Sequence, residues 1–520
     1  MLGRIIPDAA GETVAEDIPA VVRSWIAECA GADASVAHLL NDRHGPNATA
    51  FTFVDAELSA SSMTHGELAE ASARLAGGLA GLGVGRGDRV AVLMSKRREL
   101  PVALLAIWRL GAVYVPLFTA FATPAIEMRV RDAGVAVVLT EPEQRAKLDP
   151  VEGLTVIETG PDLDELAGAD AVAPVAVGAD GAFVHLFTSG TTGKPKGVPI
   201  PLRAISAFRM YLHHGLDVAA DDVFWNAADP GWAYGLYYGI VGPLAAGRAN
   251  VLYRGGFTAA ATVGIIEKLG VTNLAAAPTV YRGLIKDGVT LTQPLRRASS
   301  AGEPLTPDVT AWAPDALGTP VRDHYGQTEL GMVIANGWHD DVREPVRPGS
   351  MGRPLPGFAA GILDGQIVID VPASPLMFFT GYDGTTTDRF TPDGRWYLTG
   401  DTGRVDEDGN FFFTARDDDV IIMAGYRIGP FDVESVLVTH SGVVEAAVVG
   451  RPDRIRGEVL EAHVVLTTGT VGSAELEKEL QVLVREQYSA HAYPRRVHFV
   501  EALPKTPSGK VQRFLLRRGS

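Results

Sequence analysis

The stretch AFVHLFTSGTTGKPKG, residues 182–197, carries the strongest structural signal in this 520-residue chain. An apolar run leads into a loop whose hydroxyl and ammonium groups belong to Thr188, Ser189, Thr191, Thr192, Lys194 and Lys196. Together with backbone amides freed by glycine, such groups can surround a cluster of anionic oxygens. The loop is not a Walker A motif, because only two residues separate Gly190 from Gly193 and Pro195 follows Lys194. The stretch therefore predicts a phosphate-binding loop after a buried strand.

The segments around this loop alternate between strands and helices. Residues 64–83 carry apolar side chains at helical spacing, and Thr64 with Glu67 has the form of a capping box. Short apolar runs predict strands at 89–94, 112–117, 135–140 and 250–253. The alternation favours an α/β fold whose parallel strands are covered on both faces.

The last part of the chain has a different texture. It contains apolar runs at 444–450, 461–466 and 495–500 and a helical pattern at 473–488. These elements predict a compact α+β unit, joined to the rest near Arg416 to Asp419.

Composition narrows the function. The chain has 46 Lys and Arg against 62 Asp and Glu, a net charge of −16, which argues against a nucleic-acid surface. Its single cysteine, Cys29, allows no internal disulfide, and we expect a reducing, cytoplasmic setting. We predict neither a signal peptide nor a membrane span, since the most apolar stretch, 101–118, is interrupted by Arg109 and Pro116.

Further motifs follow the loop in a fixed order. They are GEP at 302–304, YGQTE at 325–329, YLTGD at 397–401, ARDDD at 415–419 and PKTPSGK at 504–510. With the loop at 188–197, this set resembles the adenylate-forming superfamily of acyl-CoA synthetases, luciferases and peptide-synthetase adenylation domains. The resemblance implies a large N-terminal domain, 1–417, of layered α/β subdomains, and a small mobile C-terminal α+β domain, 418–520. It also implies that ATP and CoA are co-substrates and that Mg2+ is the metal cofactor.

The resemblance assigns roles around the nucleotide. The residues it places around ATP or AMP are Thr188, Ser189, Gly190, Thr191, Thr192, Lys196, Gly302, Glu303, Pro304, Tyr325, Gly326, Gln327, Thr328, Asp401, Arg416 and Lys510. Within this set, Asp401 and Arg416 match the family's ribose contacts. Glu329 and Thr188 match the Mg2+ site, whose hard cation prefers oxygen ligands. Lys510 matches the mobile catalytic lysine, and it acts with Glu329 and Thr188.

The C-terminal part carries the predicted hinge and thiol path. By resemblance Asp418 is the hinge, and the CoA contacts are Ala424, Gly425, Tyr426, Arg427 and Arg456. Ala492 stands where many relatives carry a lysine before Tyr-Pro, which weakens one contact to CoA.

Residues 224–247 bear on the identity of the acid substrate. This stretch resembles the corresponding stretch of the medium-chain acyl-CoA synthetases. Trp232 and Tyr234 would then line the acyl pocket, with core packing as the alternative for both. Acetyl-CoA synthetases carry a bulky Trp at the position of Gly326, so we expect a medium-chain or aromatic acid rather than acetate.

Three functions remain open at this stage. The first is an acid:CoA ligase that releases pyrophosphate and forms an acyl-CoA from a small carboxylic acid. The second is a stand-alone adenylating enzyme that passes its acyl-adenylate to a carrier-protein thiol or an amine. The third is a binding protein without turnover, which intact Lys510, Glu329, Asp401 and Arg416 argue against. The sequence leaves the oligomeric state open.

Overall fold

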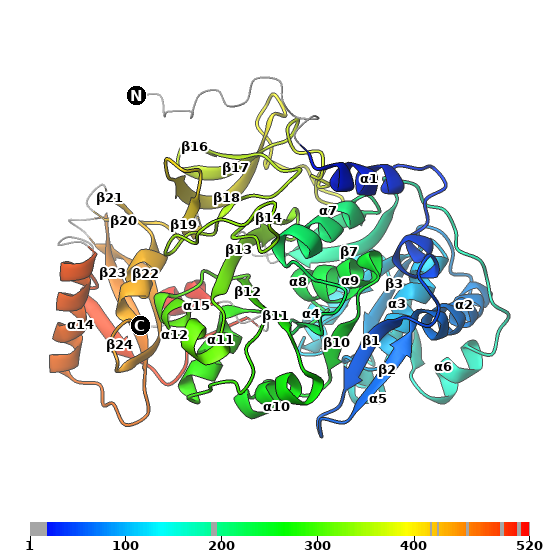
Figure 1. The fold of residues 1–520 in the computed structure, drawn as a ribbon, viewed down its shortest axis with the longest axis horizontal. Helices are drawn as coiled ribbons and strands as arrows, with labels where there is room; N and C mark the ends of the chain where they lie inside the picture. Colours follow the sequence, from blue (N-terminus) through cyan, green and yellow to red (C-terminus); the bar gives the residue numbers. More distant parts are fainter. Residues whose placement is uncertain are drawn as a thin grey trace.

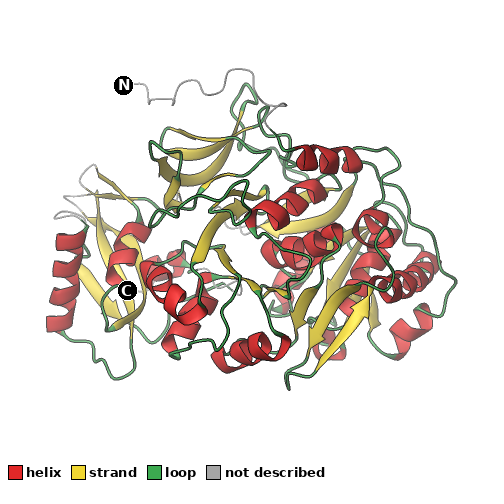
Figure 2. Cartoon of the chain, viewed as in Figure 1, coloured by secondary structure: helices red, strands yellow, loops and turns green. Residues whose placement is uncertain are grey.

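The computed structural model describes residues 18–188, 195–416, 419–423, 426–453, 457–488, 493–506 and 511–518. A large N-terminal part, coloured blue to yellow in Figure 1, is joined at one end by a smaller C-terminal part, coloured orange to red. Helices lie against the sheets of both parts (Figure 2). The predicted α/β class with a large and a small domain is confirmed.

A six-stranded sheet holds the strand before the phosphate-binding loop. Its strands, in spatial order, are β6 (Thr155–Glu158), β5 (Val137–Thr140), β3 (Arg89–Leu93), β4 (Val113–Pro116), β7 (Ala182–Thr188) and β8 (Lys196–Pro201). The helices in this stretch of the chain are α2 (His65–Gly81), α3 (Glu99–Arg109), α4 (Thr123–Ala133), α5 (Pro142–Arg145) and α6 (Pro161–Leu166). All pairings are parallel except β7 with β8.

Both faces of this sheet are buried, as predicted. Along β3, Val90 and Val92 belong to one hydrophobic cluster, whereas Ala91 and Leu93 belong to another. The period of two follows from the strand geometry, because successive side chains point to opposite faces. The first cluster includes residues of α2 and α3, and the second includes residues of α4.

A nine-stranded sheet lies beside it. Its strands, in spatial order, are β15 (Arg353–Pro354), β14 (Gly331–Ala335), β13 (Val321–Gln327), β12 (Arg297–Ala301), β11 (Asn273–Ala276), β9 (Phe224–Asn226), β10 (Asn250–Tyr253), β1 (Thr49–Val54) and β2 (Ala60–Thr64). The six central strands, from β13 to β1, pair in parallel, and antiparallel strands close both edges.

The remaining helices of the N-terminal part include three short π-helical turns, labelled η. They are α1 (Ala20–Cys29), η1 (His38–Asp42), α7 (Ala204–Met210), η2 (Tyr211–Gly215), α8 (Ala233–Leu236), η3 (Tyr237–Val241), α9 (Gly242–Ala246), α10 (Ala259–Leu269), α11 (Pro278–Lys286) and α12 (Pro307–Leu317). Among the described residues, no helix is both long enough and apolar enough to cross a bilayer.

A four-stranded antiparallel sheet, not anticipated from the sequence, leads toward the C-terminal part. Its strands are β16 (Ala360–Leu363), β17 (Gln366–Asp370), β18 (Trp396–Val405) and β19 (Phe411–Arg416). The sheet matters for function because β18 carries the YLTGD motif and β19 carries Arg416.

The C-terminal part is built on a five-stranded sheet, as the α+β prediction required. Its strands are β21 (Tyr426–Ile428), β20 (Ile421–Met423), β23 (Gly457–Leu466), β22 (Val443–Asp453) and, beside β23, β24 (Arg496–Phe499). Its helices are α13 (Pro430–Leu437), α14 (Ala474–Gln487) and α15 (Arg513–Arg518). Two hydrophobic clusters contain only residues from Ile421 onward and belong to this part. The other three clusters contain no residue beyond Phe413 and belong to the N-terminal part.

The predicted helix start at Thr64 is confirmed with its capping box. Thr64 Oγ1 accepts the backbone N–H of Glu67, and Glu67 Oε2 accepts that of Thr64, at 3.2 and 2.8 Å. These bonds satisfy two backbone groups that the helix itself cannot pair.

Removing the cap gives a direct test of this local structure. Thr64→Ala should lower the free energy of unfolding by about 1 kcal/mol, because one helix N–H loses its acceptor. Urea denaturation of the variant against the parent protein measures the change. Thr64→Ser keeps the hydroxyl and should stay close to the parent; equal losses in both variants would contradict the capping role.

Candidate active site

The phosphate-binding loop connects two paired strands. Thr188 ends β7, Lys196 begins β8, and the two residues face each other in the antiparallel ladder. The loop therefore leaves the carboxyl end of β7, where ligands gather on parallel sheets. Ser189, Gly190, Thr191 and Thr192 lie outside the described residues, so their predicted roles rest on the sequence.

Lys196 and Glu329 are joined through a tyrosine. The Lys196 ammonium lies 4.8 Å from the centre of the Tyr382 ring, and the Tyr382 hydroxyl donates to Glu329 Oε1 at 2.9 Å. Burial and the Glu329 charge raise the pKa of Tyr382 to about 12, so the hydroxyl stays protonated and donates at neutral pH. Lys196 and Glu329 thus contact the same tyrosine, with no direct ion pair between them.

The donor atoms of this cluster suit Mg2+. Glu329 is 8% exposed, and its Oε2 accepts no hydrogen bond from the described residues. The Thr188 hydroxyl belongs to the strand end opposite Lys196. A carboxylate and a hydroxyl are oxygen ligands, the type that Mg2+ takes together with waters and phosphates.

Asp401 is the centre of a second network. Its Oδ2 accepts both the Tyr325 hydroxyl and Gln327 Nε2, each at 2.6 Å, and the side chain is only 6% exposed. Gln327 is held in turn by the Tyr397 hydroxyl, which donates to its Oε1 at 3.1 Å. Both donors meet one oxygen, which leaves Oδ1 without a donor from the described residues. Arg416 lies opposite Asp401 in the β18–β19 ladder.

The GEP turn is fastened to β13. Gly302 has φ +99°, a backbone conformation that L side chains rarely adopt. Glu303 pairs with Arg282 at 3.1 Å, and after Pro304 the backbone N–H of Leu305 donates to Asp323 Oδ2 at 3.2 Å. Burial raises the pKa of Asp323 to about 7. The turn therefore depends on a carboxyl group two residues before Tyr325.

Tyrosines from η3 hold the YGQTE segment from behind. The Tyr237 hydroxyl donates to the carbonyl of Thr328 at 3.0 Å, and the Tyr238 hydroxyl accepts the N–H of Met332 at 2.7 Å. A Cβ placed on Gly326 would lie 2.0 Å from the Gly331 carbonyl oxygen. A side chain at position 326 would therefore require the β14 backbone of this chain to shift, apart from any effect on pocket size.

The two aromatic residues predicted for the acyl pocket have different surroundings. Trp232 packs with Phe118 and Phe121, with ring centres 5.2 and 5.4 Å away. Tyr234 lies 3.1 Å, oxygen to oxygen, from the Tyr211 hydroxyl. The two residues are packed against separate hydrophobic clusters, so the structure does not bring them together.

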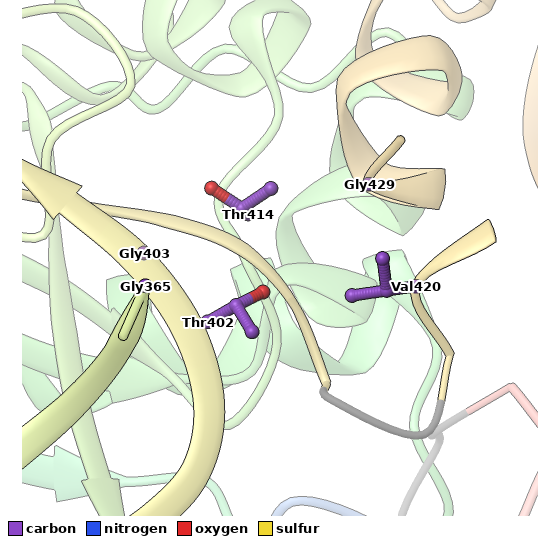
Figure 3. A pocket seen from close by; sticks show the side chains of 6 residues that line it. All are labelled: Gly365, Thr402, Gly403, Thr414, Val420 and Gly429. Carbon is purple, nitrogen blue, oxygen red and sulfur yellow. The ribbon is translucent and has the colours of Figure 1, made fainter. Parts of the chain in front are cut away.

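Much of the predicted C-terminal machinery falls outside the described residues. This holds for Lys510, Asp418, Ala424, Gly425 and Arg456, while Tyr426 and Arg427 are described only as backbone of β21. A cavity of about 170 Å3 opens where the four-stranded sheet meets this part, lined by Thr402 and Thr414 on one side and Val420 and Gly429 on the other (Figure 3).

Comparison with known proteins now decides the family. The sequence profile of AMP-binding enzymes matches residues 41–372, and that of the AMP-binding enzyme C-terminal domain matches residues 432–510. The chain belongs to the AMP-binding enzymes. It is an AMP-forming acyl-CoA synthetase that uses ATP, Mg2+ and CoA.

Individual relatives of this synthetase extend over its whole length. The acetyl-coenzyme A synthetase of Bacillus subtilis is 35% identical, with 92% of this chain and 89% of that protein aligned. The crystal structure of an acyl-CoA synthetase from Brucella canis is 44% identical, covers 96% of both chains and superposes with a TM-score of 0.75. An anthranilate CoA ligase in complex with anthranoyl-AMP is 25% identical, covers 94% of this chain and 97% of its own, and has a TM-score of 0.85.

Several residues of the synthetase's site were missed by the sequence reasoning. They are Tyr237, Tyr238, Tyr382, Tyr397 and Arg389, the last of which interacts with Tyr382. Each acts through one hydroxyl or guanidinium contact formed between distant segments. The pair YY at 237–238, inside the stretch resembling medium-chain synthetases, was the one local signal available.

The buried carboxyl of Asp323 predicts a pH effect on stability. Its folded pKa, about 7, lies above the ordinary 3.8, so the folded state binds more protons than the unfolded state between these values. This group should therefore reduce stability as pH rises from about 4 to 7, by at most ~1.4 kcal/mol per pH unit. Asp323→Asn should remove that slope, measured by urea denaturation across the pH range.

Two comparisons make the Asp323 experiment specific. Other groups titrate in both proteins, so the quantity to examine is the parent's unfolding free energy minus the variant's. Asp340→Asn, at an exposed carboxylate, is the matched control and should keep the parent's slope. An unchanged slope in Asp323→Asn would show that the carboxyl is ionised throughout.

Proposed function

We propose that the synthetase activates a medium-chain or aromatic carboxylic acid as its acyl-adenylate and then transfers the acyl group to CoA. The segment 325–329 is the observation that carries the proposal. Tyr325 and Gln327 of this segment donate hydrogen bonds to Asp401. Its last residue, Glu329, accepts a hydrogen bond from Tyr382, whose ring contacts Lys196. One short segment thus connects a ribose-type acceptor with a metal-type acceptor, as binding of a nucleoside triphosphate requires.

The residues act by position and charge in the first half-reaction. Asp401 Oδ1 accepts from the ribose hydroxyls, assisted by Arg416, while Tyr325 and Gln327 keep the carboxylate fixed. Thr188, Lys196 and the loop 189–192 bind the β- and γ-phosphates. Glu329 and Thr188 would hold Mg2+, which would supply positive charge against the phosphates. Lys510 stabilises the charge that develops between the acid's carboxylate and the α-phosphate.

A domain rotation then separates the two half-reactions. We infer that 1–417 and 418–520 move as units about Asp418, because each has its own hydrophobic clusters and the 170 Å3 cavity lies at their junction. Rotation would withdraw Lys510 and present Gly425, Arg427 and Arg456 to CoA. Hinge motion of this kind sets access in many enzymes.

The acid is inferred from the residues near Gly326. Tyr234 stacks edge-on with Tyr238, whose hydroxyl holds Met332, and Met332 is the ladder partner of Gly326. Tyr234 is thus linked to Gly326 through Tyr238 and Met332, and we place the acid beside this group of residues. Relatives act on acids as different as acetate and anthranilate, so the local residues have to decide. Each buried CH2 of a longer acid adds about 0.8 kcal/mol.

A panel of acids tests the substrate class. With CoA present, medium-chain and aromatic acids should release pyrophosphate with kcat/KM at least ~10-fold above acetate, the ratio expected for two or more buried CH2 groups. Thioester formation, followed by mass, should parallel pyrophosphate release. A preference for acetate would overturn the assigned acid, and adenylation of every acid without thioester would instead favour a carrier-protein or amine acceptor.

The lysine assignment has a separate test. Lys510→Ala should abolish pyrophosphate release while sparing transfer from preformed acyl-adenylate to CoA, because charge develops beside this lysine only in the first step. Lys505→Ala is the matched control; its ammonium pairs with Glu445 at 2.6 Å, and it should retain both half-reactions. Equal loss of both half-reactions in Lys510→Ala would contradict the role.

A further inference from the structure

Three imidazoles gather at a place that the adenylation chemistry does not use. His213 and His214 lie in η2, and His339 lies in the loop after β14. One ring nitrogen from each is within 4.8 Å of the other two. The centre of the His213 ring is 4.3 Å from that of His339 and 4.6 Å from that of His214.

The backbone fixes this arrangement. The N–H groups of Trp338 and His339 both donate to the carbonyl of His214, at 3.2 and 3.1 Å. The loop after β14 is therefore docked on η2 by main-chain bonds, which do not depend on the histidine side chains. A π-helical turn such as η2 is an uncommon element that often occurs at functional sites.

His214 has the hydrogen bonding of a metal ligand. Its Nδ1 lies 3.3 Å from the Met210 carbonyl, which can only accept, so Nδ1 carries the proton. The lone pair is then on Nε2, which is buried without a hydrogen-bond partner in a residue that is 0% exposed. Nε2 faces Asp341 Oδ2 at 3.9 Å, too far for a hydrogen bond. Metal-bound histidines commonly anchor the second nitrogen on a carbonyl in this way.

We propose that His213, His214 and His339 bind a divalent transition-metal ion of the zinc class, with Asp341 as the carboxylate that completes the site. Three imidazoles and a carboxylate suit Zn2+ and do not suit Mg2+. Asp341 Oδ2 lies 3.5 Å from His339 Nδ1, beside two of the three rings. Zn–N bonds of about 2.0–2.1 Å place ligand nitrogens about 3.3 Å apart, so binding draws the three ligating nitrogens toward one point and requires the rings to reorient.

The surroundings give the site a structural consequence. His213 also lines a cavity of about 100 Å3 with Trp25 and Arg209. The same η2 carries Tyr211, whose hydroxyl contacts Tyr234 and His324 Nδ1, at 3.1 and 2.7 Å. A metal joining η2 to the loop after β14 would thus stiffen the support of Tyr234.

Metal binding to the full-length protein tests the proposal directly. After chelator treatment, equilibrium dialysis against Zn2+ with excess Mg2+ should leave about one Zn2+ per chain, measured by elemental analysis. His213→Ala and His339→Ala should each weaken binding at least ~10-fold. His440→Ala, a histidine paired with Glu479 in the C-terminal part, is the matched control and should bind as the parent does. Zn2+ should also raise the Tm of the parent and leave that of His339→Ala unchanged.

A spectroscopic measurement keeps the proposal falsifiable even if a variant folds poorly. Co2+ bound by the parent protein should show the intense visible absorption of four-coordinate cobalt, and Zn2+ should displace it. Absence of Zn2+ binding by the parent, displacement by Mg2+, a six-coordinate Co2+ spectrum, or full retention of Zn2+ by folded His213→Ala and His339→Ala would each overturn the site.

Discussion

The close approach of β13 and β14 is the constraint on which the rest of the site depends. Gly326 faces the Gly331–Met332 backbone so closely that a Cβ at Gly326 would lie 2.0 Å from a carbonyl oxygen, and the ladder register shifts between Tyr325 and Gly326. Tyr325 and Gln327, two residues apart on β13, both reach Asp401 on the same side of the strand. The chain then turns so that Glu329 meets Tyr382. A side chain at Gly326 would disturb both networks together.

The cations of the chain differ in their contacts. The chain is acidic overall, yet three cations near its end are paired: Arg513 with Glu434 at 2.8 Å, Arg517 with Asp419 at 2.6 Å, and Lys505 with Glu445. These pairs hold the end of the chain against the start of the C-terminal part. Lys196 differs, because its described contact is the face of an aromatic ring. No ion pair with another described residue offsets its charge.

The sequence predicted what is local. The helix at Thr64, the strand at 89–94 and the helix at 473–488 follow from spacing and caps, and the structure places them at His65–Gly81, Arg89–Leu93 and Ala474–Gln487. The motifs predicted the family because each is a run of neighbouring residues and their order along the chain can be read from the sequence. What could not be predicted depends on distant contacts: the four-stranded sheet, the tyrosines behind 325–329, and the separation of Trp232 from Tyr234. The backbone contact at Gly326 could not be predicted for the same reason. The sequence does not show that the backbone of β14 occupies the space of a side chain at this position.

Ion pairs are among the contacts between the N-terminal and C-terminal parts. Arg282 of α11 pairs with Glu303 of the GEP turn at 3.1 Å and with Glu445 of β22 at 3.8 Å, and Glu445 also accepts from Lys505. The side chains of Arg282, Glu303 and Glu445 are 14%, 17% and 19% exposed, so water replaces part of the attraction when the pairs separate. An apolar interface of the same size would cost far more to separate. The separate hydrophobic clusters on either side of residue 418 keep their burial when these pairs break, so rotation can exchange ion-pair partners without unfolding either part.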